Sequence, residues 1–143
     1  MPSWRTADDE VVTALVTAAE RLGHDYHLGV TCSTDSFYAG QSRDGFGGFR
    51  AAGAEERIEA LQEAGVVNFE MEASAIMTLA GLYGLRAGAV CTVYANRVTG
   101  EFRTEGEAKA AETASLAAAI LARMDRRKAE ADVDRWTADM SLE

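Results

Sequence analysis

The chain has 143 residues, the usual size of one domain, and 48% of them are hydrophobic, which is enough for a proper core. Its net charge of −9 argues against binding to nucleic acids or anionic membranes, because phosphate contacts need a surplus of Lys and Arg. There is no apolar run of about 18 residues, and residues 1–10 lack a basic stretch followed by an apolar one, so we expect no membrane span and no secretory signal.

The first third of the sequence predicts a helix, a buried strand and a long loop. Thr6 is the predicted N-cap of the helix because Asp9 follows three residues later, which comes close to a capping box. Apolar residues then recur on one face until Gly23, the predicted end of the helix. Residues 27–33 have the apolar character of a buried strand, and residues 34–53 form a glycine-rich loop of a kind that often carries function.

The rest of the chain alternates between helices and strands and ends in a charged tail. Apolar runs interrupted by glycines predict helices over residues 55–64, 70–83 and 105–123, and strands over residues 66–69 and 86–95. The charges that alternate from Asp125 onward predict that the tail extends the last helix into solvent or frays. We therefore divide the chain into a folded part, residues 1–124, and a charged tail, residues 125–143.

The alternation of helices and strands indicates an α/β layer fold. Three strands make a thin sheet, however, whose edges would stay unpaired and whose helices would be half covered. We therefore expect the chain to hold only part of a larger sheet that another segment or subunit completes. The apolar faces left open also favour self-association.

The cysteines and histidines indicate neither a disulfide nor a metal site. Cys32 and Cys91 both lie in apolar, strand-like stretches, which is typical of small buried hydrophobes. The histidines are His24 and His27, and no Cys/His cluster offers a set of zinc ligands. These features suit a reducing compartment, so we expect the chain to be cytoplasmic.

Side chains that could bind a planar heterocycle gather in the loop after the first predicted strand. Phe37 offers a face for stacking, the Gln41 amide can pair with an imide edge, and the Arg43 guanidinium can stabilise a developing anion. Together they describe a receptor for an oxygen-rich base such as uracil. The alternative interpretation, which the spacing alone favours, is a glycine loop with polar surface residues.

Two further groups of candidate residues lie at the ends of the later predicted strands. Glu70 and Glu72 fall at a helix N-terminus, where carboxylates stay ionised and can accept hydrogen bonds from ribose hydroxyls, while Met71 can pack on the sugar. The structural alternative is charge compensation of the helix end by the two carboxylates, with Met71 in the core. The last group, at the end of the last predicted strand, is Tyr94, Ala95, Asn96 and Arg97. Because ligands of open α/β sheets bind beyond the carboxyl ends of strands, we expect the three groups to converge.

These stretches resemble the nucleoside phosphorylase family, and its uridine phosphorylase branch in particular. Residues 29–43, GVTCSTDSFYAGQSR, are similar to the branch's stretch GVTxSxDxFYxGQxR, whose FYxGQxR part is fairly specific to pyrimidine nucleosides. Residues 67–74, VNFEMEAS, are similar to the segment VxNxEMEx, which purine nucleoside phosphorylases and nucleosidases share. LRAG at residues 85–88 and NR at residues 96–97 also match. The similarity covers the C-terminal half of such proteins and nearly the whole of this chain except its tail.

The resemblance implies a fold and an activity. The fold is a three-layer α/β/α sandwich of the nucleoside phosphorylase type, of which this chain would hold part of the central mixed sheet. The activity is reversible phosphorolysis of uridine to uracil and ribose 1-phosphate, with phosphate as co-substrate and with no cofactor and no metal. Arg43 and Glu72 are then the expected catalytic residues. The expected substrate-binding residues are Phe37, Gln41, Arg43, Glu70, Met71, Glu72, Tyr94 and Ala95.

The resemblance also implies partners and leaves alternatives open. The expected ligand is a small-molecule nucleoside, and the expected assembly is a homo-oligomer or a complex with the missing N-terminal half, which carries the family's phosphate-binding residues. A purine-type nucleosidase or phosphorylase is one alternative, but it needs an acid where Asn96 stands, and an amide cannot protonate a purine. The other alternative is a non-catalytic remnant or nucleoside-binding module.

Overall fold

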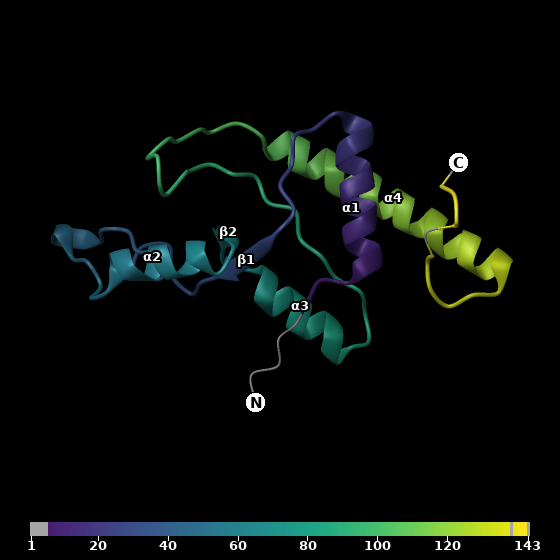
Figure 1. Cartoon of the computed structure of the whole chain (residues 1–143), viewed down its shortest axis with the longest axis horizontal. Helices are drawn as coiled ribbons and strands as arrows, with labels where there is room; N and C mark the ends of the chain where they lie inside the picture. The colour runs from purple at the N-terminus through teal and green to yellow at the C-terminus, as the bar shows by residue number, and fades with distance from the viewer. Residues whose placement is uncertain (1–5, 138, 143) are drawn as a thin grey trace.

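The computed structural model describes residues 6–137 and 139–142. Its elements are α1 (Asp9–Leu22), β1 (Val30–Ser33), the 3₁₀ turn η1 (Phe46–Gly48), α2 (Ala54–Glu63), β2 (Val66–Glu70), α3 (Ala73–Leu82) and α4 (Glu107–Ala131). Figure 1 shows an open arrangement in which α1 crosses α4 on one side, while β1, β2 and α2 form an arm on the other. The predicted class, an α/β fold with an incomplete sheet, is confirmed.

The main buried cluster lies between α1 and α4. Ala14 and Ala18 of α1 face Ala117 of α4, and these small side chains let the two helices approach closely. Ile120 and Met124 fill the space beside them, and Met124 is fully buried. The core of the described chain is therefore a helix pair rather than a covered sheet.

The first helix ends where predicted but begins with a different cap. Asp8, not Thr6, is the N-cap: its carboxylate accepts the backbone N–H groups of Glu10 at 3.0 Å and Val11 at 3.2 Å. Gly23 closes the helix in the left-handed conformation, at φ 66°. The prediction for Thr6 was wrong because the capping-box spacing marks a region of a few residues, and the backbone path selects the one that caps.

We expect Asp8→Ala to lower the free energy of unfolding by about 1 kcal/mol, because two N–H groups of the first turn lose their acceptor. Urea titration followed by circular dichroism measures the change. The matched control is Thr6→Ala, which removes an exposed side chain that does not cap the helix. Equal losses in the two variants would contradict this assignment.

The two strands of the sheet run parallel and bring their carboxyl ends together. Ser33 at the end of β1 pairs with Glu70 at the end of β2, and α2 lies in the long connection that a parallel pair requires. The strands approach so closely at the start of β1 that a Cβ on Gly29 would stand 2.7 Å from a methyl group of Val67. The loop after Ser33 and the turn after Glu70 therefore begin side by side.

The strand predicted over residues 86–95 is not formed. This segment has no regular secondary structure in the described chain, and its one ladder contact is an isolated bridge between Ala95 and Phe102. A strand is stable only when a neighbour satisfies its backbone groups. Here the backbone C=O of Ala87 instead accepts the N–H of Asp8, so the apolar sequence lacks the pairing that would make it a strand.

The boundaries of the later helices also differ from the predictions. β2 continues to Glu70, so α3 begins at Ala73 rather than at residue 70. α4 runs to Ala131, beyond the predicted end at residue 123, as an extension by the tail would require. The tail does not point into solvent, however, because Trp136 and Leu142 pack against the cluster between α1 and α4.

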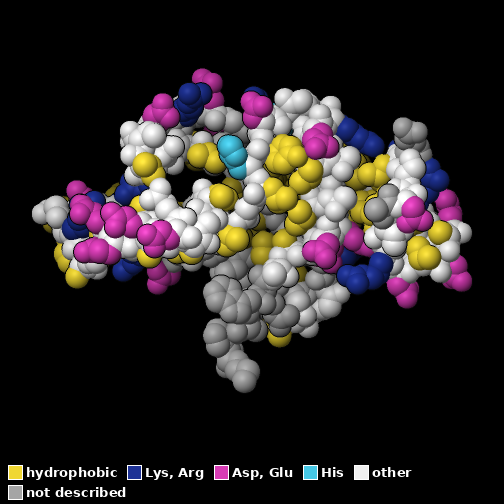
Figure 2. All heavy atoms as spheres, viewed as in Figure 1, with side chains coloured by type: hydrophobic (Ala, Val, Ile, Leu, Met, Phe, Trp, Pro, Cys, Tyr) yellow, Lys and Arg dark blue, Asp and Glu magenta, His cyan; other side chains and the backbone are white. Residues whose placement is uncertain are grey.

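The chain exposes an unusually large surface for its size. Its accessible area is 10152 Å², whereas a compact monomer of 15.3 kDa exposes about 7,100 Å². Large apolar side chains account for part of the excess: Phe46, Leu82 and Tyr83 are 103%, 69% and 76% exposed. Figure 2 shows hydrophobic side chains lying open over the middle of the visible face. Among the described helices, none is long and apolar enough to cross a membrane.

Candidate functional site

The loop after β1 folds into a tight turn that positions the predicted base-binding residues. The backbone N–H of Arg43 donates to the C=O of Tyr38 at 2.8 Å, which closes the turn. Gly40 is required there, because a Cβ would stand 2.6 Å from the C=O oxygen of Ser36. The Arg43 guanidinium lies over the Phe37 ring, 4.3 Å from its centroid. Gln41 is 6% exposed, and its side-chain N–H donates to Thr34 at 3.4 Å.

A second guanidinium joins this loop from the distant segment after residue 95. Arg97 donates to the backbone C=O of Ser42 at 3.1 Å. The Nε atoms of Arg43 and Arg97 and the hydroxyl of Ser42 are buried without a hydrogen-bond partner. In the described parts of the chain, neither arginine forms an ion pair with a carboxylate. Two cations thus share a site in which no carboxylate of the described residues forms an ion pair with either of them.

These residues surround an open hollow of ≈ 400 Å³. It is lined by Phe37, Tyr38, Ser42, Arg43, Asp44, Arg50 and Arg97. Burial, and then the charge of Arg97, lower the pKa of the Arg43 guanidinium from its ordinary value. Arg50, by contrast, is paired with both Asp44 and Glu55. A planar group that carries partial negative charge would satisfy the free donors of this hollow.

Glu70 holds the junction between β1, β2 and α3 together. One of its carboxylate oxygens accepts the backbone N–H groups of Glu72 at 2.8 Å and Ala73 at 2.5 Å, and the other accepts the Ser33 hydroxyl. Ser33 in turn accepts the N–H of Ser74 at 2.9 Å. Burial alone would raise the pKa of Glu70, but the hydrogen bonds from Ser33, Ala73 and Glu72 outweigh it and lower the pKa. Glu70 therefore stays ionised at the end of β2, where it accepts the first N–H groups of the turn that leads into α3.

Met71 and Glu72 lie on the exposed side of the same turn. Both are exposed, and the Glu72 carboxylate makes only a long contact, 3.3 Å, with the N–H of Met71. Glu72 therefore has free acceptor capacity, whereas Glu70 has committed its oxygens. The two carboxylates of this turn therefore lie in different surroundings.

The third predicted group is only partly brought to the site. The Tyr94 hydroxyl pairs with the Glu107 carboxylate, and this hydrogen bond raises the pKa of Tyr94. Ala95 is held in the bridge to Phe102. The residue of this segment that reaches the loop after β1 is Arg97, which sequence analysis placed in the third candidate group without a specific role. Its position just after a predicted strand was the available signal, but the meeting with Ser42 spans 55 residues.

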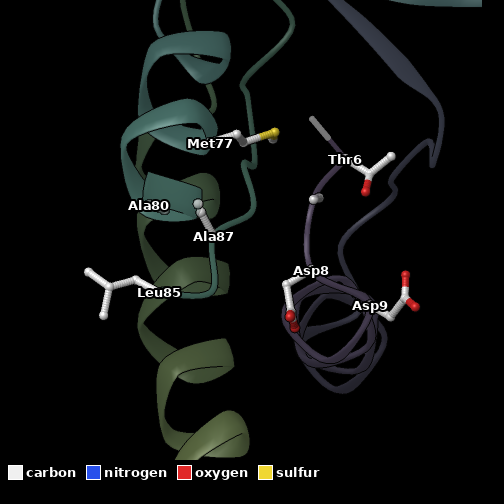
Figure 3. A pocket seen from close by; sticks show the side chains of 9 residues that line it. Thr6, Asp8, Asp9, Met77, Ala80, Leu85 and Ala87 are labelled. Carbon is white, nitrogen blue, oxygen red and sulfur yellow. The ribbon is translucent and has the colours of Figure 1, made fainter. Parts of the chain in front are cut away.

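A second hollow, of ≈ 330 Å³, lies away from this site. It is formed between the start of α1 and α3 with the segment after it, and Figure 3 shows Met77 pointing across from α3 toward Thr6. Its lining carboxylates, Asp8 and Asp9, belong to the first turn of α1, where Asp8 caps the helix. In the part of the chain that the structure covers, no group of three or more His, Cys, Asp or Glu residues could hold a metal ion.

Known proteins resemble the chain across the site residues. A family model described as "Phosphorylase superfamily" matches residues 2–124. A uridine phosphorylase of Thermococcus kodakarensis is 52% identical over 134 residues, which are 94% of this chain and 48% of that protein. The uridine phosphorylase of Escherichia coli K12 is 40% identical over 85% of this chain and 47% of its own length. A guanosine phosphorylase of Halorubrum lacusprofundi is 36% identical over 65% of this chain and 33% of that protein. The chain thus spans about half the length of the uridine phosphorylases it matches.

Proposed function

Because this chain belongs to the phosphorylase superfamily, we propose that it supplies the base- and ribose-binding part of a uridine phosphorylase. In the reaction, a phosphate oxygen bonds to the anomeric carbon of uridine as the bond from that carbon to the uracil nitrogen breaks. Uracil leaves with the bonding electrons and becomes neutral on protonation, and ribose 1-phosphate is the other product. Phosphate is the co-substrate, and the proposal includes no cofactor and no metal.

The observation that carries this proposal is the pair of arginines with unpaired buried donors. As the glycosidic bond breaks, negative charge develops on the uracil ring and its oxygens. Arg43 and Arg97 offer fixed positive charge at a partly buried site, where such stabilisation is stronger than in open water. Phe37 supplies the stacking face, and Gln41 supplies a donor and an acceptor for the imide edge of uracil.

On the sugar side, we assign the ribose hydroxyls to Glu72 and the apolar face of the sugar to Met71. Glu72 is exposed with free acceptor capacity, and Met71 is 40% exposed beside it. Glu70 contributes by holding this turn against Ser33 and the first N–H groups of α3. We assign Tyr94 and Ala95, which lie on the segment that carries Arg97, to the lining of the base pocket.

The purine alternative has less support. The Asn96 side-chain oxygen accepts hydrogen bonds from the backbone N–H groups of Val98 at 2.9 Å and Thr99 at 3.0 Å, which stabilises a turn. Its amide is not an acid and cannot protonate a purine base. The uridine phosphorylases cited above also match more of the chain than the guanosine phosphorylase does. A nucleoside-binding module without turnover remains the second candidate, because the chain spans about half of those enzymes.

We further propose that the site is completed by a polypeptide region outside this chain, in a homo-oligomer or in a complex with the complementary half. The chain exposes about 3,000 Å² more surface than a compact monomer of its mass would. One partner of a standard interface buries only about 800 Å², so this excess is large enough for an obligate interface. Such a region would cover the open edges of the two-stranded sheet. It would also cover the exposed apolar side chains of α3, which are Ile76, Leu79 and Leu82. The free thiols of Cys32 and Cys91 support a cytoplasmic setting.

The experiment that tests the function measures uracil release from uridine, with and without phosphate. The chain is assayed alone and mixed with the half of the Thermococcus kodakarensis enzyme that it does not match. Phosphate-dependent release by the mixture supports the proposal. Binding of uridine without release in any mixture would support the binding module instead, and absence of binding would contradict both.

We expect Gln41→Glu to weaken uracil binding at least tenfold, about 1.4 kcal/mol. The substitution keeps the size of the side chain but replaces an N–H donor with an oxygen that repels a uracil carbonyl. Isothermal calorimetry with uracil measures the change. Gln62→Glu, an exposed residue on α2, is the charge-matched control and should bind as the unmodified chain does. Unchanged binding by the Gln41 variant would remove this residue from the site.

A further inference from the structure

The carboxylate of Glu10, in the first turn of α1, connects segments that are far apart in the sequence. It accepts hydrogen bonds from Nζ of Lys128, at 2.8 Å to one oxygen and 2.6 Å to the other. It also accepts hydrogen bonds from Nη1 of Arg86 at 2.5 Å and from the backbone N–H of Trp136 at 2.9 Å. The side chains of Glu10 and Lys128 are only 16% and 11% exposed. Four donor contacts on one shielded carboxylate are more than an incidental surface ion pair provides.

Asp125 completes the network on α4. Its oxygens accept Nη2 of Arg86 at 2.6 Å and lie 3.3 Å from Nζ of Lys128. Two carboxylates therefore balance two cations, and Arg86 is held from both sides. Arg86 begins the segment whose later residues include Tyr94 and Arg97, so the network also anchors the start of that segment.

The chain beyond α4 turns back onto this network. Asp132 adopts the left-handed conformation, at φ 55°, and the N–H of Val133 donates to the C=O of Lys128 at 3.0 Å, which ends the helix. Figure 1 shows the segment after α4 looping back beside the helix. Trp136 and Leu142 then pack against the cluster between α1 and α4. An apolar anchor and a backbone hydrogen bond thus hold the same short segment.

We propose that the described segment after α4, residues 132–137 and 139–142, forms a C-terminal strap that closes on α1, with Glu10 as its catch. The closed strap covers one end of the α1–α4 cluster and, through Lys128 and Asp125, fixes Arg86 at the start of the segment that leads to Arg97. When the strap opens, the Trp136 N–H leaves Glu10, and the end of the cluster is exposed. The strap itself lies beyond residue 124, outside the stretch matched by the family model, whereas Glu10 and Arg86 lie inside it. The proposal does not depend on the proposed activity.

Limited trypsin digestion of the full chain tests the strap. Trypsin cleaves after the exposed Arg135, but the next residue is Trp136, whose N–H is bound to Glu10, so cleavage requires the strap to open. We expect Glu10→Gln to speed cleavage after Arg135 at least tenfold. Cleavage after Arg103, which lies in an exposed loop away from the strap, is expected to keep its rate.

Matched controls make the outcome decisive. Glu20→Gln removes the same charge from an exposed position of α1 that pairs with Tyr26 instead, and it should leave both cleavage rates unchanged. A synthetic peptide of residues 130–143 gives the rate without protection. The proposal is overturned if the unmodified chain is cut as fast as the peptide, if Glu10→Gln changes the Arg135 rate less than twofold, or if cleavage after Arg103 rises equally.

A spectroscopic measurement checks the same opening without a protease. The chain has two tryptophans, so a Trp4→Phe background leaves Trp136 as the reporter. In this background, Glu10→Gln should shift the Trp136 emission to longer wavelength and increase quenching by acrylamide. An unchanged spectrum would mean that Trp136 stays packed without the catch, and it would count against the strap.

Discussion

Replacing Arg43 by Ala is expected to lower kcat/KM for uridine phosphorolysis by about 10²–10³-fold in the complete assembly. The guanidinium lies over Phe37 beside Arg97, and its buried Nε has no partner within the described chain. Its charge is therefore available to the uracil anion that forms as the glycosidic bond breaks. Because this charge matters most in the transition state, most of the loss should fall on kcat.

Two further variants separate this role from a general effect of charge. Arg43→Lys keeps the positive charge but loses the planar fork of donors, so it should recover only part of the activity. Arg21→Ala removes an arginine from the last turn of α1, far from the hollow, and should change kcat/KM less than threefold. A similarly small change for Arg43→Ala would show that Arg43 does not stabilise the leaving base.

Glu70→Ala is expected to cost about 3 kcal/mol of the free energy of unfolding, because its carboxylate accepts hydrogen bonds from three donors, one at the end of β1 and two at the start of α3. The N–H groups of Glu72 and Ala73 and the Ser33 hydroxyl all lose their acceptor. Glu70→Gln keeps one acceptor oxygen and should cost roughly half as much. Urea titration measures both variants, and Glu63→Ala, at the exposed end of α2, is the control with little expected effect.

The same variants predict a dependence on pH. Since the folded chain lowers the pKa of Glu70, its stabilising contribution is present above the carboxyl's ordinary pKa and is lost as pH falls through the lowered value. The difference in unfolding free energy between the unmodified chain and Glu70→Gln should therefore be constant near pH 7 and shrink below about pH 4. A difference that grew on acidification would contradict the assignment of an ionised carboxylate.

Local sequence signals selected the candidate residues but left their contacts undetermined. Phe37, Gln41 and Arg43 were selected from the residue types in one loop and from the family resemblance, and the structure places the Arg43 guanidinium over the Phe37 ring. Arg97 was included in the third candidate group but received no role of its own, because its approach to Ser42 depends on how a segment 55 residues away returns to the loop. The sequence placed both Glu70 and Glu72 at a helix N-terminus, and only the path of the turn directs the Glu70 carboxylate to the N–H groups there and leaves Glu72 exposed.

The sequence by itself determined which segments become helices and where glycines end them, because caps, left-handed glycines and apolar periodicity act within a few residues. It also determined that β1 and β2 are strands and that the candidate groups follow their ends. Only the tertiary structure decided that residues 86–95 stay without a strand, because pairing needs a neighbour that an isolated segment cannot provide. It likewise decided that the tail returns to Glu10, since that contact spans 126 residues and depends on how α1 and α4 pack.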